Sequence, residues 1–192
     1  PLTYTEYNGN VYWTNKTTIG WLPSDSDEAR PVGVPPPEVS PTLSAGNGAL
    51  LPGKYAVTLT YLDDRREEGG ATPVQIIDLP NGGGITLNGL PMRAGWAFRV
   101  YITDPDGSKF HRSEELPAVF PSYTITQTAQ GGDCDTQFLT PMPPGEFITW
   151  LAGRLYTAKL GTLYFSEAMR PHLNNPAHGL IQFSGYISFI EA

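Results

Sequence analysis

Short stretches of alternating apolar and polar residues run along the chain, and glycines and prolines recur between them. The clearest stretch spans residues 53–61, where Tyr55, Val57, Leu59 and Tyr61 occupy alternate positions, with Lys54, Thr58 and Thr60 on the other face. Successive side chains of a strand point to opposite faces, so this spacing predicts a β-strand with one apolar face. Further strands are expected at residues 74–77, 84–88, 97–103, 109–113, 123–126 and 136–139. About seven short strands within roughly 100 residues are typical of an immunoglobulin-like or fibronectin-type sandwich.

The two ends of the chain carry the same kind of pattern. Strands are expected at residues 2–7, 11–14, 147–151, 154–158, 162–166, 180–183 and 186–190. Asn8-Gly9 is a strong signal for a two-residue hairpin turn between the first two of these strands. Residues 169–176 contain Pro171 and Pro176, and we expect this segment to be an irregular loop.

Two proline-rich stretches divide the chain. Pro35–Pro37 and Pro143–Gly145 favour extended connections that neither a helix nor a central strand can use. The predicted organisation is therefore strands of one domain in residues 1–37, an inserted sandwich in residues 38–143, and strands of the first domain again in residues 144–192. The inserted segment is expected to fold as a separable domain.

A short repeat links the two ends. Gly9–Asn15 and Gly161–Glu167 follow the same pattern at an offset of 152 residues. In order, the seven positions are a glycine, any residue, an aliphatic residue, a tyrosine, a large aromatic residue, a hydroxyl residue and a polar residue. Residues 153–156 form a weaker copy. A turn glycine followed by an aliphatic and aromatic strand is what one blade of a β-propeller repeats. We expect Tyr12 and Tyr164 in neighbouring or equivalent blade strands. The alternative is a chance match of a common strand opening.

Composition agrees with an all-β fold. The 192 residues include 21 glycines and 19 prolines, which interrupt any long helix. A net charge of −7 argues against a dedicated nucleic-acid or anionic-membrane binder, and Arg65-Arg66 lies directly before Glu67-Glu68 in what reads as a solvated loop. The single cysteine, Cys134, has no partner for a disulfide within the chain. The chain opens on Pro1 and stops after an apolar stretch, so a piece of a longer protein is expected.

Residues that could carry chemistry do not form a recognisable pattern, and we predict no catalytic, cofactor or metal site. The acidic pairs Asp104/Asp106 and Asp133/Asp135 have the spacing that opens a calcium loop, but the late glutamate of such a loop is missing. Turns and loops explain both pairs better. The histidines, His111, His172 and His178, lack the spacing of a zinc site. The glycine run at residues 81–84 lacks the features of a phosphate loop. Core or interface packing is the simpler account of Trp13, Trp21, Trp96 and Trp150.

Several motifs together resemble a family of tailed-phage virion proteins. They are Asn8-Gly9-x-Val11-Tyr12, Arg30-Pro31-x-Gly33-x-Pro35, Gly53-x-Tyr55-x-Val57-x-Leu59-Thr60-Tyr61, Arg99-Val100-Tyr101-x-Thr103, Pro143-Pro144-Gly145 and Gly153-Arg154-Leu155-Tyr156 with Leu163-Tyr164-Phe165-Ser166-Glu167. Each motif alone has low specificity, but together they cover nearly the whole chain. The resemblance implies propeller blades interrupted by an immunoglobulin-like insertion, similar in plan to the tail nozzle or hub of short-tailed phages, which assembles as a ring around the DNA exit channel.

The expected function is therefore that of a non-enzymatic structural component of a virion. Its partners would be copies of itself in a ring and other tail proteins, close to packaged DNA without specific binding and with no membrane span. One alternative is a carbohydrate-binding or adhesion module that recognises a host surface glycan. Another is a polysaccharide-degrading enzyme whose active site lies in blades outside this chain.

Overall fold

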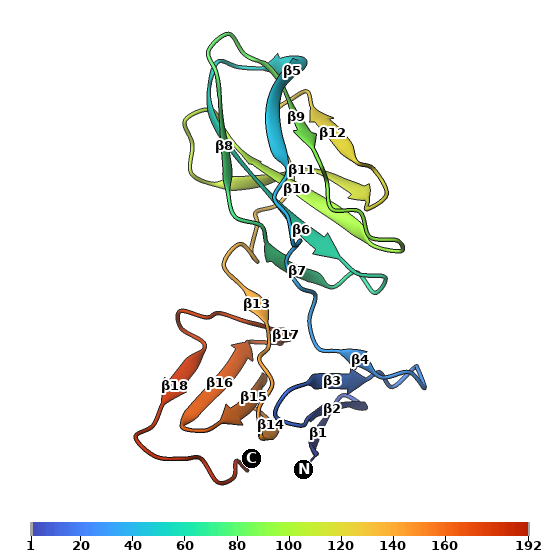
Figure 1. Ribbon diagram of the computed structural model, residues 1–192, viewed down its shortest axis with the longest axis vertical. Helices are drawn as coiled ribbons and strands as arrows, with labels where there is room; N and C mark the ends of the chain where they lie inside the picture. Colours follow the sequence, from blue (N-terminus) through green and yellow to red (C-terminus); the bar gives the residue numbers. More distant parts are fainter. Residues whose placement is uncertain (1, 192) are drawn as a thin grey trace. The chain divides into compact units, whose positions relative to one another are not determined.

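A computed structural model describes residues 2–191 (Figure 1). The described chain is built from antiparallel strands and contains no helix, which confirms the prediction of an all-β protein. It divides into two compact units. Unit 1 combines the residues up to Gly33 with those from Phe138 onward, and unit 2 is the continuous segment Val34–Gln137.

Unit 2 contains two sheets that face each other across one core. In one sheet the order is β11-β10-β6-β7, with β8 also paired to β6, and in the other it is β12-β9-β5. The strands are β5 (Thr42–Leu50), β6 (Gly53–Leu62), β7 (Glu68–Ala71), β8 (Gln75–Leu79), β9 (Gly83–Asn88), β10 (Ala97–Thr103), β11 (Phe110–Pro117) and β12 (Ser122–Ile125).

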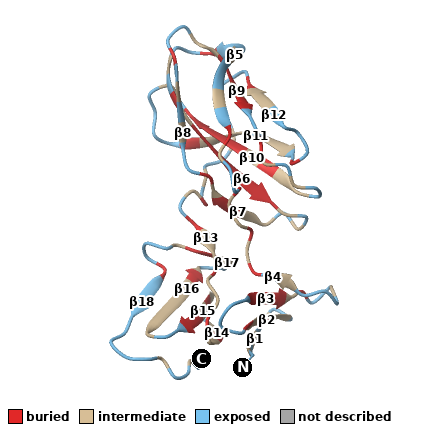
Figure 2. Cartoon of the chain, viewed as in Figure 1, coloured by how far each residue is buried: buried red, intermediate tan, exposed pale blue. Residues whose placement is uncertain are grey.

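Strand β6 is the centre of unit 2. Its alternating apolar side chains lie in the core together with residues of β9, β10 and β12, and Leu59 is 0% exposed. The opposite face of β6 is also covered, because Thr58 and Thr60 are 0% exposed. In Figure 2 much of β6 is red, the colour of buried residues. Thr58 Oγ1 donates to the carbonyl of Thr72 at 2.8 Å, which satisfies its buried hydroxyl. The predicted strand is thus present, but both of its faces are buried.

Unit 1 contains two meandering sheets, one from each end of the chain. The first has the order β1-β2-β3-β4, and the second has the order β13-β17-β16-β15-β14, with β18 also paired to β16. The strands are β1 (Thr3–Tyr7), β2 (Asn10–Thr14), β3 (Ile19–Leu22), β4 (Arg30–Pro31), β13 (Thr140–Pro141), β14 (Phe147–Leu151), β15 (Arg154–Lys159), β16 (Thr162–Glu167), β17 (Arg170–Asn174) and β18 (Leu180–Gln182).

The first hairpins of the two sheets turn in the same way. Asn8 and Gly9 have φ values of +51° and +74°, and Ala152 and Gly153 have +48° and +79°. Positive φ at both central residues is the signature of the type I′ turn, whose twist matches that of the flanking strands. The predicted hairpin at Asn8-Gly9 is therefore confirmed, and β1–β2 and β14–β15 are equivalent hairpins by their turn conformation.

The inner faces of the two sheets share one core. It contains Tyr12, Ile19 and Trp21 of the first sheet with Ile148 and Leu155 of the second. Tyr164 of β16 packs against the same core, so Tyr12 and Tyr164 lie in separate sheets that share a core. The ring of Tyr7 in β1 stacks on Trp150 in β14 with centroids 3.7 Å apart.

A buried hydroxyl connects the two ends of the chain at the edge of this core. Thr14 Oγ1 donates to the carbonyl of Gly145 at 2.9 Å, and the amide of Gly145 donates to Thr14 Oγ1 at 3.0 Å. Thr14 is 0% exposed. The amide of Lys16 also donates to the carbonyl of Gly145, at 2.7 Å.

The proline-rich stretches lie close to the limits between the units, a few residues after each limit. Val34 is 2% exposed and belongs to the core of unit 2, so the prolines that follow it are part of that unit. In unit 1, Thr157 Oγ1 donates to the carbonyl of Pro143 at 2.9 Å. The predicted limits at residues 37/38 and 143/144 therefore differ from the observed limits at 33/34 and 137/138.

Four local predictions are wrong. Residues 136–139 form a turn followed by the short β13, and 186–190 form no strand. The segment expected to be irregular contains β17, which accommodates Pro171 because β13 pairs only with its end, at Leu173 and Asn174. The glycine-rich segment after the first proline stretch, not expected to be a strand, is β5. A Cβ on Gly46 would meet Thr86 Oγ1 at 2.7 Å, so this close strand pairing needs a glycine.

The Thr14–Gly145 hydrogen bonds yield a prediction for stability. Thr14→Val keeps the shape of the side chain but leaves the buried amide of Gly145 without its acceptor, whereas the carbonyl of Gly145 still accepts from the amide of Lys16. We expect a loss of about 1–3 kcal/mol, the cost of a buried unsatisfied polar group. Urea unfolding followed by tryptophan fluorescence measures it, since Trp13, Trp21 and Trp150 all lie in unit 1. Thr17→Val, at an exposed position, is the control and should change stability by less than about 0.5 kcal/mol.

Candidate functional site

The outer face of the β1–β4 sheet carries aromatic side chains directed away from the shared core. Antiparallel partners share a face, and Tyr4 pairs with Trp13, which in turn pairs with Gly20. Tyr4 is 72% exposed. The Trp13 indole lies directly on Gly20, where a Cβ would approach its Cζ2 atom to 2.3 Å. Gly20 therefore makes room for a flat tryptophan on the open face of this sheet.

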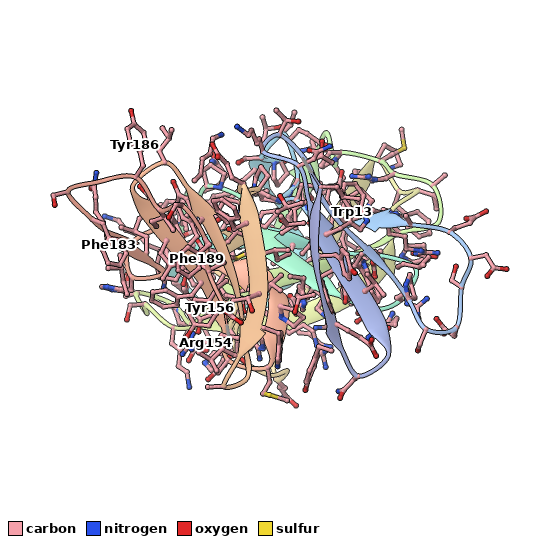
Figure 3. All side chains as sticks on the ribbon, turned by 90° about the horizontal axis from the view of Figure 1, so that it is seen from below. Trp13, Arg154, Tyr156, Phe183, Tyr186 and Phe189 are labelled. Atoms are coloured by element: carbon pink, nitrogen blue, oxygen red, sulfur yellow. The ribbon has the colours of Figure 1, made fainter. Side chains whose placement is uncertain are left out.

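The outer face of the second sheet is also aromatic. Tyr156 in β15 pairs with Phe165 in β16, and their ring centroids are 6.1 Å apart. The guanidinium of Arg154 lies 5.4 Å from the Phe165 ring and donates to the carbonyl of Ser166. Arg154 and Tyr156 are half-buried, so part of each remains open to a partner (Figure 3).

The segment that follows β18 adds exposed aromatic rings to unit 1. Phe183 is 50% exposed, Tyr186 84% and Phe189 70%. In Figure 3 the side chain of Tyr186 points away from the ribbon. Backbone bonds hold the segment in place: the amide of Phe183 donates to Gly161 and that of Ile187 donates to Leu160, both at 2.8 Å. Clustered apolar side chains that remain in water indicate interaction surfaces. The outer faces of the two sheets and residues 183–189 are therefore the candidate assembly surface.

Unit 2 carries a network of charged side chains on its larger sheet. Glu68 in β7 accepts hydrogen bonds from Tyr101 at 2.7 Å and Thr60 at 2.6 Å, and it pairs with Arg99. Arg99 also pairs with Glu115 at 3.0 Å, and Glu115 pairs with Arg66 at 2.6 Å. The network joins β6, β7, β10 and β11 side by side. Its charges satisfy one another, so we regard it as a structural element.

Burial and the network shift several pKa values. Burial, with a hydrogen bond to Glu68, raises the pKa of Tyr101 well above its ordinary value. Burial also raises the pKa of Cys134 to about 12, so its thiol is protonated at neutral pH and is a poor nucleophile. Burial alone would raise the pKa of Glu115, but hydrogen bonds and charges from Arg66 and Arg99 outweigh it and leave that pKa below its ordinary value.

The acidic pairs considered from the sequence lie in turns and ion pairs. Asp104–Gly107 is the turn between β10 and β11: the amide of Gly107 donates to the carbonyl of Asp104 at 2.9 Å. Asp133 pairs with Lys109 at 2.8 Å and with His111 at 3.2 Å. Within residues 2–191, no three His, Cys, Asp or Glu side chains gather where they could hold a metal ion.

The remaining candidates lie apart from one another. His172 and His178 are in unit 1, and His111 and the loop of residues 81–84 are in unit 2. Trp21 is buried in the core of unit 1, and Trp96 of unit 2 stacks under Arg93 at 3.5 Å. Sequence reasoning did not single out Tyr4, and it named Arg154 and Phe165 only as parts of motifs and not as surface residues. The exposed side of an alternating strand could have suggested them, had the core-facing side been known.

The Glu115 ion pairs predict how stability depends on pH. A carboxylate whose pKa is lower in the folded state stabilises that state above its unfolded pKa, and this contribution is lost as pH falls through the folded pKa. We therefore expect the stability of unit 2 to fall below about pH 4.5, the ordinary glutamate value. Glu115→Gln should reduce stability at pH 7 and flatten its decline in acid. Thermal unfolding from pH 3 to pH 7 tests this, with Glu6→Gln in unit 1 as the control. An unchanged acid slope in Glu115→Gln would contradict it.

Comparison with known proteins adds no assignment. No protein-family model matches the sequence, and a search of curated proteins gives no match. Among residues 2–191 there is no helix of the length and apolarity needed to cross a membrane. The case for a function therefore rests on the surfaces described above and on the motif resemblance.

Proposed function

We propose that this chain is a non-enzymatic structural component of a phage virion, part of the tail nozzle or hub or of an adjoining assembly. In this proposal unit 1 is a partial β-propeller and unit 2 an inserted immunoglobulin-like sandwich. The observation that carries the proposal is that the outer faces of both unit 1 sheets carry partly exposed aromatic side chains.

Strand order supports the propeller part of the proposal. Strands β1 to β4 and strands β14 to β17 are each adjacent in the order of the sequence, as in a four-stranded blade. The first strands of these two runs of four, β1 and β14, contact each other, and the two inner faces share a core. First strands of neighbouring blades meet in this way around the axis of a propeller.

The arrangement of unit 2 supports the sandwich part. The chain crosses between its two sheets several times, since β5, β9 and β12 belong to one sheet and β6–β8, β10 and β11 belong to the other. Both sheets contribute to one apolar core, with Ile85 from the first and Phe98 from the second fully buried. Such crossing between two packed antiparallel sheets is a feature of immunoglobulin-like folds.

The assembly part follows from the two outer faces. Each blade of a propeller packs both faces against neighbours, whereas each unit 1 sheet uses only its inner face here. A different surface on each side of the unit allows a head-to-tail interface, and such interfaces close into rings when the rotation permits. Partners of this kind are other copies of the chain and other tail proteins.

The virion location rests on the motif resemblance, and immunogold electron microscopy of the phage that encodes this chain would test it. Antibodies raised against the purified chain should label the tail end of intact particles. Labelling confined to the lysate, or no signal in purified particles, would overturn the virion assignment. An activity screen on host polysaccharides with the same protein should show no cleavage.

Exposed aromatic side chains yield a prediction for self-association. Tyr4→Ser and Phe189→Ser remove rings that are 72% and 70% exposed, so neither should lower stability appreciably. If these rings are interface anchors, each change should weaken association about tenfold, or about 1.4 kcal/mol. Sedimentation equilibrium measures the effect. Met92→Ser, at a 62% exposed position of unit 2, is the matched control. A wild-type chain that stays monomeric at high concentration would contradict a ring of copies.

A further inference from the structure

Unit 2 contains a polar groove beside its charged network. The groove has a volume of about 640 Å³, within the range of small-molecule sites. Polar side chains of β11, of β12 and of the segment after β12 line it, and Arg112, Tyr123, Gln127, Thr128 and Gln130 are among them. Because most of the lining is polar, its ligand has to supply many hydrogen-bonding groups.

The wall formed by residues 126–131 is held at both ends. The amide of Ala49 donates to the carbonyl of Thr126 at 2.6 Å. At the other end the amide of Gly131 donates to the carbonyl of Arg112 at 3.0 Å, and the amide of Arg112 donates to that of Gly132 at 2.9 Å. A wall fixed in this way lowers the entropy cost of binding.

The two arginines that line the groove differ in whether their charge is paired. The guanidinium of Arg66 is paired with Glu115, which Arg99 also holds. Arg112 is half-buried, and among residues 2–191 its guanidinium has neither a hydrogen-bond nor an ion-pair partner. The side chains of Gln127 and Gln130 likewise make no hydrogen bond within the described chain. The groove therefore offers the guanidinium of Arg112, the amides of Gln127 and Gln130, and the carboxylate of Glu114.

The remaining acidic side chain limits what can bind. The carboxylate of Glu114 accepts a hydrogen bond from the amide of Glu115 at 3.2 Å and also lines the groove. Burial and the charge of Glu114 raise the pKa of Tyr123, which keeps its phenol a donor. A densely anionic polymer such as a nucleic acid would meet repulsion from Glu114. A ligand with many hydroxyls and a single, well-placed carboxylate fits both side chains, because the carboxylate can pair with Arg112 and a hydroxyl can donate to Glu114.

We infer that this groove binds an acidic saccharide, with Arg112 holding a uronic-acid carboxylate and Gln127, Thr128 and Gln130 holding sugar hydroxyls. The planar guanidinium binds a carboxylate through two parallel hydrogen bonds, which gives both affinity and orientation. The partly buried ring of Tyr123 offers a face to the sugar. This inference does not depend on the virion role, because the groove lies wholly within unit 2.

Two matched oligosaccharides test the inference. The first is a disaccharide of glucuronic acid and N-acetylglucosamine, which carries one carboxylate, and the second is the same molecule with that carboxyl reduced to an alcohol. Amide chemical shifts of the full chain locate binding, and calorimetry measures its affinity. The acidic sugar should shift the amides of Arg112, Gln127 and Gln130, and the reduced sugar should bind at least about tenfold more weakly.

Variants of the full chain complete the test. Arg112→Gln should weaken binding of the acidic sugar about tenfold or more, and Arg112→Lys should recover only part of it, because lysine lacks the planar fork. Lys54→Gln removes one exposed positive charge outside the groove and should leave binding unchanged. No groove shifts at about 1 mM sugar, equal affinity for both sugars, or an unaffected Arg112→Gln would each overturn the inference.

Discussion

Hydrogen bonds between Thr14 and both backbone groups of Gly145 join the two ends of the chain inside unit 1. They hold two meandering sheets, separated by the whole of unit 2 in the sequence, against one shared core. Because the inner faces pack on this core, the opposite faces of the sheets, with their aromatic side chains, are left at the surface of unit 1. Unit 1 therefore depends on contacts of very high sequence separation, and such contacts form late and slowly in folding. Its core cannot close before the residues beyond Phe138 are present.

Unit 2 has no such requirement, since its core is drawn from one continuous segment. Strand β6 is buried on both faces, and the Glu68–Arg99–Glu115 network binds its neighbours through charge. This network and the adjoining groove both contain arginine and glutamate side chains, but these side chains have different roles in the two places. Paired carboxylates and guanidinium groups stabilise the sheet, whereas the guanidinium of Arg112, which has no partner among residues 2–191, is available to a ligand.

The two units therefore suit two kinds of recognition. Exposed rings such as Tyr4 and Tyr186 suit broad, apolar contacts with protein partners, where aromatic anchors contribute most of the affinity. The groove of unit 2 suits a small polar ligand that is held by direction-dependent hydrogen bonds. A structural protein that also carries a saccharide groove would combine assembly and surface recognition in one chain.

Local patterns in the sequence predicted the all-β class, the alternation in β6 and the turn at Asn8-Gly9, because pleat and turn geometry depend on neighbouring residues alone. They did not predict β5, whose glycines are poor strand formers and pair closely with β9 only in the folded unit. Nor did they predict β17, which tolerates Pro171 because β13, on the side away from β16, pairs only with Leu173 and Asn174. Two further features likewise depend on residues distant in sequence. One is which face of each sheet is the outer face, and the other is which arginine has no partner among residues 2–191. Arg99 and Glu68 are 31 residues apart, and only tertiary packing brings them together.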